Sequence, residues 1–250
     1  MPPLTEMSSI ETRSGRRLAY RFRPGRSPTI LFLPGYMSDM EGSKATALDE
    51  WAAAEGRAML RFDYGGCGAS EGAFEAQGLD DWLGDMLAMI DRVAPEGPLV
   101  LVGSSMGGWL MLLAALARPE RVAALVGIAA APDFTDWGFS EEERRVLAEA
   151  GRLEQASPYG EAPFVTTLRF WESGQRSLLL GSEIAIDGPV RLLHGQRDAD
   201  VPWRNALALA DKLRSADVQT LLIKDGDHRL SRPQDVALLI AAVHAVMEQA

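Results

Sequence analysis

Cysteine and histidine are both scarce in this 250-residue chain. Its one cysteine, Cys67, allows no disulfide within the chain, which is typical of a protein from a reducing compartment such as the cytosol. Only three histidines are present, so any catalytic histidine must be one of these three. His194 is too isolated to indicate a metal site, and no motif implies a metal or an organic cofactor. We therefore expect chemistry that uses the chain's own side chains.

Excess positive charge is also missing. The chain has 25 lysines and arginines against 35 aspartates and glutamates, a formal net charge of −10. Binding to phosphates requires a basic face, so we expect no nucleic acid partner. The same charge disfavours a general affinity for anionic membranes.

Long hydrophobic runs are absent as well. The longest, residues 109–117 and 122–132, are shorter than the about 20 residues that a membrane-spanning helix needs. The first residues lack the basic and apolar regions of a signal peptide. We therefore expect a soluble, cytoplasmic protein with no stable membrane anchor.

A G-x-S-x-G motif is present in residues 103–107. It follows a short run of branched apolar residues over 99–102, which predicts a buried strand, and it precedes a predicted helix over 108–117. Strand, tight turn and helix are the setting of a nucleophile elbow. The alternative is a Gly/Ser-rich turn that matches the motif by chance.

The elbow assigns the nucleophile by steric reasoning. Its strained turn requires small residues two positions before and two positions after the reactive serine. Gly103 and Gly107 meet that requirement for Ser105, whereas Ser104 would put Val102 in the crowded position. The predicted nucleophile is therefore Ser105.

Short apolar runs alternate with helical patterns along most of the chain. This alternation predicts an α/β fold with a mostly parallel sheet covered by helices on both faces. The predicted strands span residues 29–33, 58–62, 99–102, 122–128, 190–193 and 218–223.

The alternation breaks between residues 133 and 187, a stretch of mostly helical composition with helices expected over 140–150 and 163–180. Ligands of such folds bind at the carboxyl ends of the strands, where an insertion of this kind would lie. We therefore expect a helical lid, residues 133–187, on an α/β core formed by residues 1–132 and 188–250. The alternative is a packed excursion that contacts no ligand.

Arginine is concentrated near the N-terminus, with six between positions 13 and 26. Extended runs over 8–13 and 17–22 predict a hairpin there. Because arginines alternate with apolar residues, we expect a solvated edge hairpin that is protected from aggregation by its charge. The alternative is an anion-binding patch.

A serine nucleophile needs a base, and the base needs an orienting acid. His228 follows the last predicted strand and is the expected base. His244 lies within the last helix, and His194 ends a strand, where we expect its ring to pack beneath the site. Asp198 fits H-G-x-x-D-x-x-V-P after the strand over 190–193 and is the expected acid. Asp200 is the alternative, unless it caps the next helix.

The site also needs donors for an oxyanion and a surface for the substrate. We expect the donors to be the backbone N–H groups of Met106, after the nucleophile, and of Tyr36, in the loop after the strand over 29–33. Apolar side chains in that loop and in the insertion could hold an acyl chain. The expected substrate-binding residues are Met37, Trp137, Phe170 and Trp171, with the Tyr36 ring beside them.

Several longer runs extend these motifs over nearly the whole chain: residues 34–38, 61–64, 103–111, 191–195, 201–203 and 227–229. Together they resemble the α/β-hydrolase superfamily, and within it the mitochondrial acyl-protein thioesterases that also act as acyl-glucuronide esterases, with their bacterial relatives. The resemblance implies an α/β-hydrolase fold and a triad at Ser105, Asp198 and His228. It also implies removal of S-acyl, palmitoyl-like groups or hydrolysis of activated carboxylic esters.

The expected partner is thus an acylated protein or a small-molecule ester or thioester. Two other classes of function stay open. A general carboxylesterase or a peptidase could use the same triad, although an aminopeptidase would need acidic lid residues, and residues 141–143 are expected to begin a helix instead. A non-enzymatic ligand-binding protein is the remaining alternative, but such proteins usually lack a triad member, and none is missing.

Overall fold

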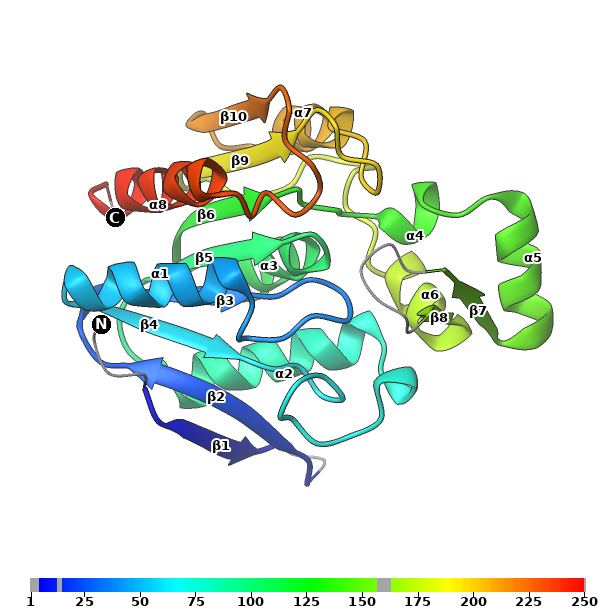
Figure 1. Ribbon diagram of the computed structural model, residues 1–250, viewed down its shortest axis with the longest axis horizontal. Helices are drawn as coiled ribbons and strands as arrows, with labels where there is room; N and C mark the ends of the chain where they lie inside the picture. Colours follow the sequence, from blue (N-terminus) through cyan, green and yellow to red (C-terminus); the bar gives the residue numbers. More distant parts are fainter. Residues whose placement is uncertain (1–4, 13–14, 157–162, 250) are drawn as a thin grey trace.

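The computed structural model describes residues 5–12, 15–156 and 163–249. Its centre is an eight-stranded sheet in the order β1-β2-β4-β3-β5-β6-β9-β10 (Figure 1). The first two strands form an antiparallel edge, and the pairs from β4 to β10 are parallel, which confirms the predicted α/β sheet. The strands are β1 (Met7–Glu11), β2 (Arg17–Arg23), β3 (Arg26–Leu33), β4 (Arg57–Phe62), β5 (Leu99–Ser104), β6 (Val122–Ile128), β9 (Val190–Gly195) and β10 (Val218–Ile223).

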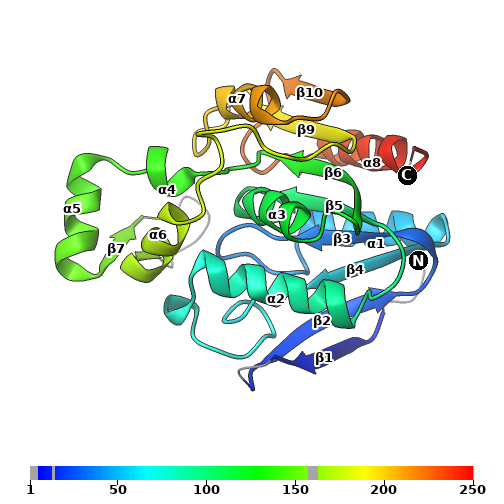
Figure 2. The same cartoon turned by 180° about the vertical axis from the view of Figure 1, so that it is seen from behind.

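Helices cover both faces of this sheet. In Figure 1, α1 (Ser43–Ala54) and α8 (Pro233–Met247) lie in front of the sheet. Figure 2 shows α2 (Leu79–Arg92), α3 (Met106–Ala117) and α7 (Arg204–Lys212) on the opposite face. None of the helices in the described part of the chain is long and apolar enough to cross a membrane.

Two apolar cores result, one on each face. Side chains of β5 alternate between them: Leu99 and Leu101 belong to the core that includes α2 and α3, and Val100 and Val102 to the core that includes α1 and α8. Because β5 is buried on both faces, its sequence is a continuous apolar run rather than an alternating one. This arrangement holds the carboxyl end of β5, and the motif that follows it, in a fixed place.

An insertion separates β6 from β9. Figure 1 shows it beyond the arrowheads of β5, β6 and β9, at the carboxyl ends of the parallel strands. Six residues of it, 157–162, lie outside the described residues. Its elements are α4 (Phe134–Trp137), α5 (Glu141–Ala150), β7 (Arg152–Gln155), β8 (Phe164–Thr167) and α6 (Leu168–Gln175).

The helix expected over 163–180 is wrong at both ends. Its first residues form β8, which pairs with β7 in an antiparallel hairpin, and α6 begins only at Leu168 and ends at Gln175. The Phe-Val-Thr-Thr sequence of β8 combines an aromatic with β-branched residues, which favour strands. Thr167 then caps α6, since its hydroxyl accepts a hydrogen bond from the Phe170 N–H.

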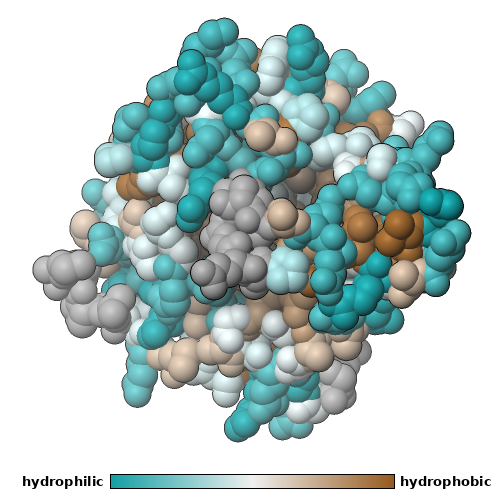
Figure 3. All heavy atoms as spheres, turned by 45° about the vertical axis from the view of Figure 1, so that its right-hand side comes forward, coloured by the Kyte–Doolittle hydropathy of each residue, from teal (hydrophilic) through white to brown (hydrophobic). Residues whose placement is uncertain are grey.

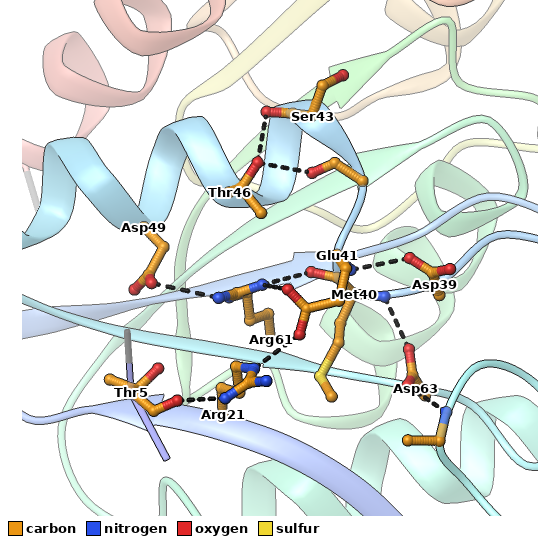
Figure 4. A network of polar contacts seen from close by, with 12 residues as sticks. Thr5, Arg21, Asp39, Met40, Glu41, Ser43, Thr46, Asp49, Arg61 and Asp63 are labelled. Atoms are coloured by element: carbon orange, nitrogen blue, oxygen red, sulfur yellow. Dashed lines mark hydrogen bonds and ion pairs between the residues drawn. The ribbon is translucent and has the colours of Figure 1, made fainter. Parts of the chain in front are cut away.

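Several N-terminal arginines form ion pairs, Arg21 among them (Figure 4), while the side chain of Arg17 stays 67% exposed. Arg21 bonds to Glu41, and the side chain of Arg61, on β4, is 1% exposed and contacts both Glu41 and Asp49. Arg61 also donates to the Met40 carbonyl at 2.8 Å. The expectation of a solvated hairpin therefore fits Arg17 but not Arg21, whose side chain is 19% exposed. Arg21 and Arg61 both hold the loop between β3 and α1 through Glu41.

Candidate active site

The motif in residues 103–107 forms a sharp turn between β5 and α3. Ser105 has φ 54° and ψ −119°, a strained backbone conformation for a residue with a side chain. A Cβ added at Gly103 would lie 2.4 Å from the Gly107 carbonyl oxygen, and one at Gly107 would lie 2.2 Å from the Leu33 carbonyl oxygen. The two glycines are thus required by backbone contacts around Ser105.

Three loops at the carboxyl edge of the sheet bring a serine, a histidine and an aspartate together. The Oγ of Ser105, after β5, lies 3.2 Å from Nε2 of His228, after β10. The Nδ1 of His228 lies 2.8 Å from Oδ2 of Asp198, after β9. Since a carboxylate only accepts, Nδ1 carries the ring proton and Nε2 is free to accept from the serine hydroxyl.

Close backbone packing places the loops of Asp198 and His228 beside each other. A Cβ added at Gly195 would lie 2.3 Å from the Gly226 carbonyl oxygen, so only glycine allows this approach. The Arg197 N–H donates to the same carbonyl at 2.9 Å. The loops that carry Asp198 and His228 are therefore joined before their side chains meet.

Asp198 is surrounded by donors. Its side chain is 0% exposed; Oδ1 accepts from the N–H groups of Asp200 and Val201 at 2.9 and 2.8 Å. Burial by itself would raise the pKa of Asp198, but hydrogen bonds from His194, His228 and Val201 hold it well below its usual value. Asp200 is exposed, and its backbone N–H is one of the two that donate to Oδ1.

His194 contacts the acid directly, which the sequence reasoning missed. Its fully buried ring places Nε2 3.1 Å from Asp198 Oδ2 and 3.0 Å from the Val201 carbonyl oxygen. The expectation that the ring packs beneath the site describes its position but not this contact. The spacing of four residues between His194 and Asp198 is the feature of the sequence that could have predicted this contact.

The predicted oxyanion donors flank Ser105. Met106 follows it in the chain and is the first residue of α3. The loop after β3 lies against the serine from the other side, since a Cβ added at Gly35 would be 3.4 Å from Ser105 Cβ. Tyr36 is the next residue in that loop.

The Tyr36 ring points away from the loop into a cluster of aromatic rings, and its hydroxyl donates to the Val165 carbonyl of β8 at 2.7 Å. Burial raises the pKa of this hydroxyl, which therefore remains a donor. The loop after β3 is thus bonded to the insertion. The rings around Tyr36, with centroids 4.8–6.3 Å away, belong to Phe74, Trp82, Phe134, Phe164 and Phe170.

The four expected substrate-binding residues do not form one surface. Met37 is 43% exposed, and Trp137 is partly exposed. Phe170 is 1% exposed within the aromatic cluster, and Trp171 donates to the Thr135 carbonyl inside the insertion. Figure 3 brings the side of the molecule with the insertion forward. Most of the surface in that view is polar, and a compact hydrophobic patch lies at its right. In this structure Phe170 is therefore a core residue.

Within the described residues, one group has the composition of a metal site. Ligand atoms of Asp198, Asp200 and His228 lie within 4.8 Å of one another. However, the Nδ1 of His228 and the Oδ2 of Asp198 are hydrogen-bonded to each other, and Oδ1 accepts two backbone N–H groups. The group is arranged to orient an imidazole.

Known proteins match this chain over nearly its whole length. The family described as serine aminopeptidase, S33, matches residues 26–156. The human protein named palmitoyl-protein thioesterase ABHD10, mitochondrial, is 39% identical over 98% of this chain and 81% of its own. The structure of mouse alpha/beta hydrolase domain-containing protein 10 has a TM-score of 0.92 and 40% identity, covering 98% of this chain and 99% of that one. The chain belongs to the ABHD10 branch of the α/β-hydrolase superfamily.

A bacterial structure, a putative hydrolase from Agrobacterium vitis S4, is similar to the same degree, with a TM-score of 0.91 and 39% identity over 98% of this chain and 99% of that one. As a member of the ABHD10 branch, the chain is a serine hydrolase with the α/β-hydrolase fold. The expectation of a cytoplasmic location is contradicted, because the ABHD10 relatives from human and mouse are both named as mitochondrial.

Proposed function

We propose that this hydrolase cleaves acyl thioesters of the S-palmitoyl-protein class, and related carboxylic esters, through an acyl-enzyme on Ser105. The hydrogen-bonded series from Ser105 through His228 to Asp198 carries the proposal. The proposed substrate class is supported by the 39% identity between this chain and a human protein named palmitoyl-protein thioesterase.

In the first half of the reaction, Ser105 Oγ attacks the carbonyl carbon as its proton moves to His228 Nε2. Asp198 keeps the imidazole oriented and stabilises the imidazolium. When the tetrahedral intermediate collapses, the carbon–sulfur bond breaks and His228 returns the proton to the leaving thiolate. The products are a free thiol and an ester of Ser105.

In the second half, water takes the place of the serine. His228 accepts a proton from the water as its oxygen attacks the acyl-enzyme, and the second intermediate collapses to release a carboxylic acid and Ser105. In both intermediates we assign the N–H groups of Met106 and Tyr36 to the oxyanion. The position of Met106 at the start of α3 supports this role, because helix N-termini favour negative charge.

We assign the insertion, residues 133–187, as a lid that selects the acyl group. Its place beyond the carboxyl ends of β5, β6 and β9 supports this role (Figure 1). The bond from Tyr36 to Val165 supports it further, since it joins the insertion to the loop beside Ser105. Met37 and Trp137, which keep exposed surface, are the proposed contacts for an acyl chain.

The match to the serine aminopeptidase family favours peptidase activity as a second candidate. An aminopeptidase needs carboxylates near the site for the substrate ammonium. The glutamates at the start of α5 serve the helix instead: Glu143 accepts from the N–H and hydroxyl of Ser140, and Glu142 pairs with Arg145. These contacts favour the thioesterase over the peptidase.

The test is kcat/KM for acyl thioesters and matched oxygen esters from acetyl to palmitoyl, with Ser105→Ala as the control. Thioester rates that rise with chain length would support the proposal. A maximum at short chains with oxygen esters equal or better would replace it with a small-molecule carboxylesterase. Turnover of aminoacyl peptides alone would replace it with the peptidase.

A further inference from the structure

His194 is the second histidine that contacts Asp198, and it has no role in the proposed reaction. Its Nε2 has two neighbours within hydrogen-bonding distance, the Oδ2 of Asp198 at 3.1 Å and the Val201 carbonyl oxygen at 3.0 Å. Both neighbours only accept hydrogen bonds, so the ring proton of His194 resides on Nε2 and is shared between them.

The other ring nitrogen supports the same tautomer. Nδ1 of His194 is buried and has no hydrogen-bond partner. A protonated Nδ1 would be an unpaired buried donor, which costs more than an unpaired acceptor nitrogen. The Nε2–H group of His194 therefore bonds to the Val201 carbonyl and also lies within reach of Asp198 Oδ2.

This contact completes the hydrogen bonding of the acid. A carboxylate offers about four lone-pair directions. Two backbone N–H groups occupy Oδ1, from Asp200 and Val201, and two imidazole N–H groups meet Oδ2, from His194 and His228. Any rotation of the Asp198 carboxylate would therefore break several contacts at once, which holds Oδ2 in line with His228.

The contact also divides the negative charge of Asp198. A carboxylate that donates part of its electron density to one N–H group stabilises a second, protonated partner less. In the described residues, the ionisable side chains that meet at this carboxylate are His194 and His228, and the exposed Asp200 lies beside them. Removing the Nε2–H of His194 would leave more of the charge for His228.

We propose that His194 is a positioning residue that acts through Asp198: its Nε2–H fixes the carboxylate and limits how strongly that carboxylate favours the protonated form of His228. The inference rests on the proposed function only in assigning His228 as the base and Asp198 as the acid. It predicts a specific change in pH dependence, which a residue that merely fills space would not cause.

The test is the second-order rate at which a fluorophosphonate labels Ser105, measured from pH 5 to pH 9, together with kcat/KM on a thioester. His194→Leu removes the donor, and we expect the acidic limb of both profiles to move to higher pH by roughly half a unit. The rate on the alkaline plateau should fall roughly three- to tenfold as the carboxylate loses its alignment.

Two further variants distinguish alignment from packing. His194→Gln retains an Nε2–H group at a similar reach and should restore most of the wild-type profile. Val201→Ala removes packing from the same loop but retains both backbone groups that contact His194 and Asp198, so it should lower Tm without moving the acidic limb. We also expect the low-field proton resonance of the His228–Asp198 hydrogen bond to shift in His194→Leu and to return in His194→Gln.

A wild-type profile in His194→Leu would overturn the inference. So would an equal displacement in His194→Gln, or the same displacement in Val201→Ala. Labelling does not depend on the substrate class, so a wild-type enzyme that labels normally but leaves thioesters intact would refute the proposed function and still test His194.

Discussion

The carboxyl edge of the sheet and the insertion between β6 and β9 are built in different ways. At the edge, close backbone packing at Gly107 and Gly195 fixes the loops, and Asp198 has four donors around its carboxylate. The insertion consists of short elements that meet the core through aromatic packing and separate polar links. The edge is thus held mainly by backbone contacts, and the insertion mainly by side-chain contacts.

Three sets of hydrogen bonds hold the insertion together or join it to the core. The Asp133 carboxylate, at its start, accepts the N–H groups of Leu179 and Leu180 near its end. The Ser173 hydroxyl on α6 accepts from the Leu79 N–H on α2 at 2.7 Å. The link through Tyr36 differs from these, because it alone among the three begins in the loop beside Ser105. Substitutions in each region should therefore have separable effects.

Ser105→Ala should have the largest effect on activity and almost none on the insertion. Without the proposed nucleophile we expect kcat to fall by about 10⁴-fold or more. Alanine, like serine, has a Cβ, so both residues meet the same strain at the positive φ of position 105. We therefore expect Tm to stay near that of the wild type. Ester hydrolysis and thermal unfolding measure the two effects. Retained turnover at a substantial rate would show that the chemistry does not depend on the elbow.

The same substitution, Gly→Ala, can be placed in both regions. At Gly107 the new Cβ would lie 2.2 Å from the Leu33 carbonyl oxygen, and we expect a loss of about 3 kcal/mol or more in the free energy of unfolding. Gly181, in the insertion, has open space around it, so Gly181→Ala should change stability by less than about 0.5 kcal/mol. Urea unfolding of the two variants measures the difference. Similar losses would contradict the contrast between the regions.

Local rules account for the way these residues meet at the carboxyl edge. The spacing of Gly103 and Gly107 selects Ser105 because the contacts that exclude a Cβ lie within the turn and its neighbouring strand. Strand ends at one edge of a parallel sheet must meet, which brings Asp198 and His228 to the serine. The sequence missed the contact of His194 with the acid, because that contact depends on how the loop after β9 closes.

The insertion was harder to predict because its contacts are non-local. The strands β7 and β8 pair although residues 157–162 separate them in the sequence. The helical composition of this stretch therefore predicted a helix where β8 forms. Phe170 was expected at the substrate surface, but it packs against Tyr36 from a distant loop. A single sequence shows that an aromatic residue is present and does not show which other ring will cover it.

Tyr36→Phe tests whether the two regions communicate. The variant keeps the ring in its cluster and loses the hydroxyl that bonds to the Val165 carbonyl. We expect kcat to fall roughly three- to tenfold, because the loop that carries a proposed oxyanion donor loses its tie to the insertion. Ser173→Ala is the matched control, since it also removes one bond between insertion and core but lies away from Ser105. It should lower Tm and leave kcat near wild type. Equal kcat losses in both variants would show a general loosening.

A further prediction concerns pH and is confined to the carboxyl edge. Lys44, on α1, donates to the Arg229 carbonyl beside His228 at 2.5 Å, and burial lowers the pKa of its ammonium from 10.5 to about 8. Between these two values the unfolded chain binds more protons than the folded one, so this group makes stability rise with pH.

We therefore compare the free energy of unfolding of wild type and Lys44→Met at pH 7.5, 8.5 and 9.5. The difference should move in favour of the wild type as pH rises, by at most about 1.4 kcal/mol per pH unit, because deprotonation relieves a buried charge that the variant never carries. Other titrating groups cancel in this difference. In Ser173→Ala, whose link is uncharged, the same comparison should be flat. A flat result for Lys44→Met would mean that the Lys44 ammonium remains hydrated, and that the loop of His228 is held without it.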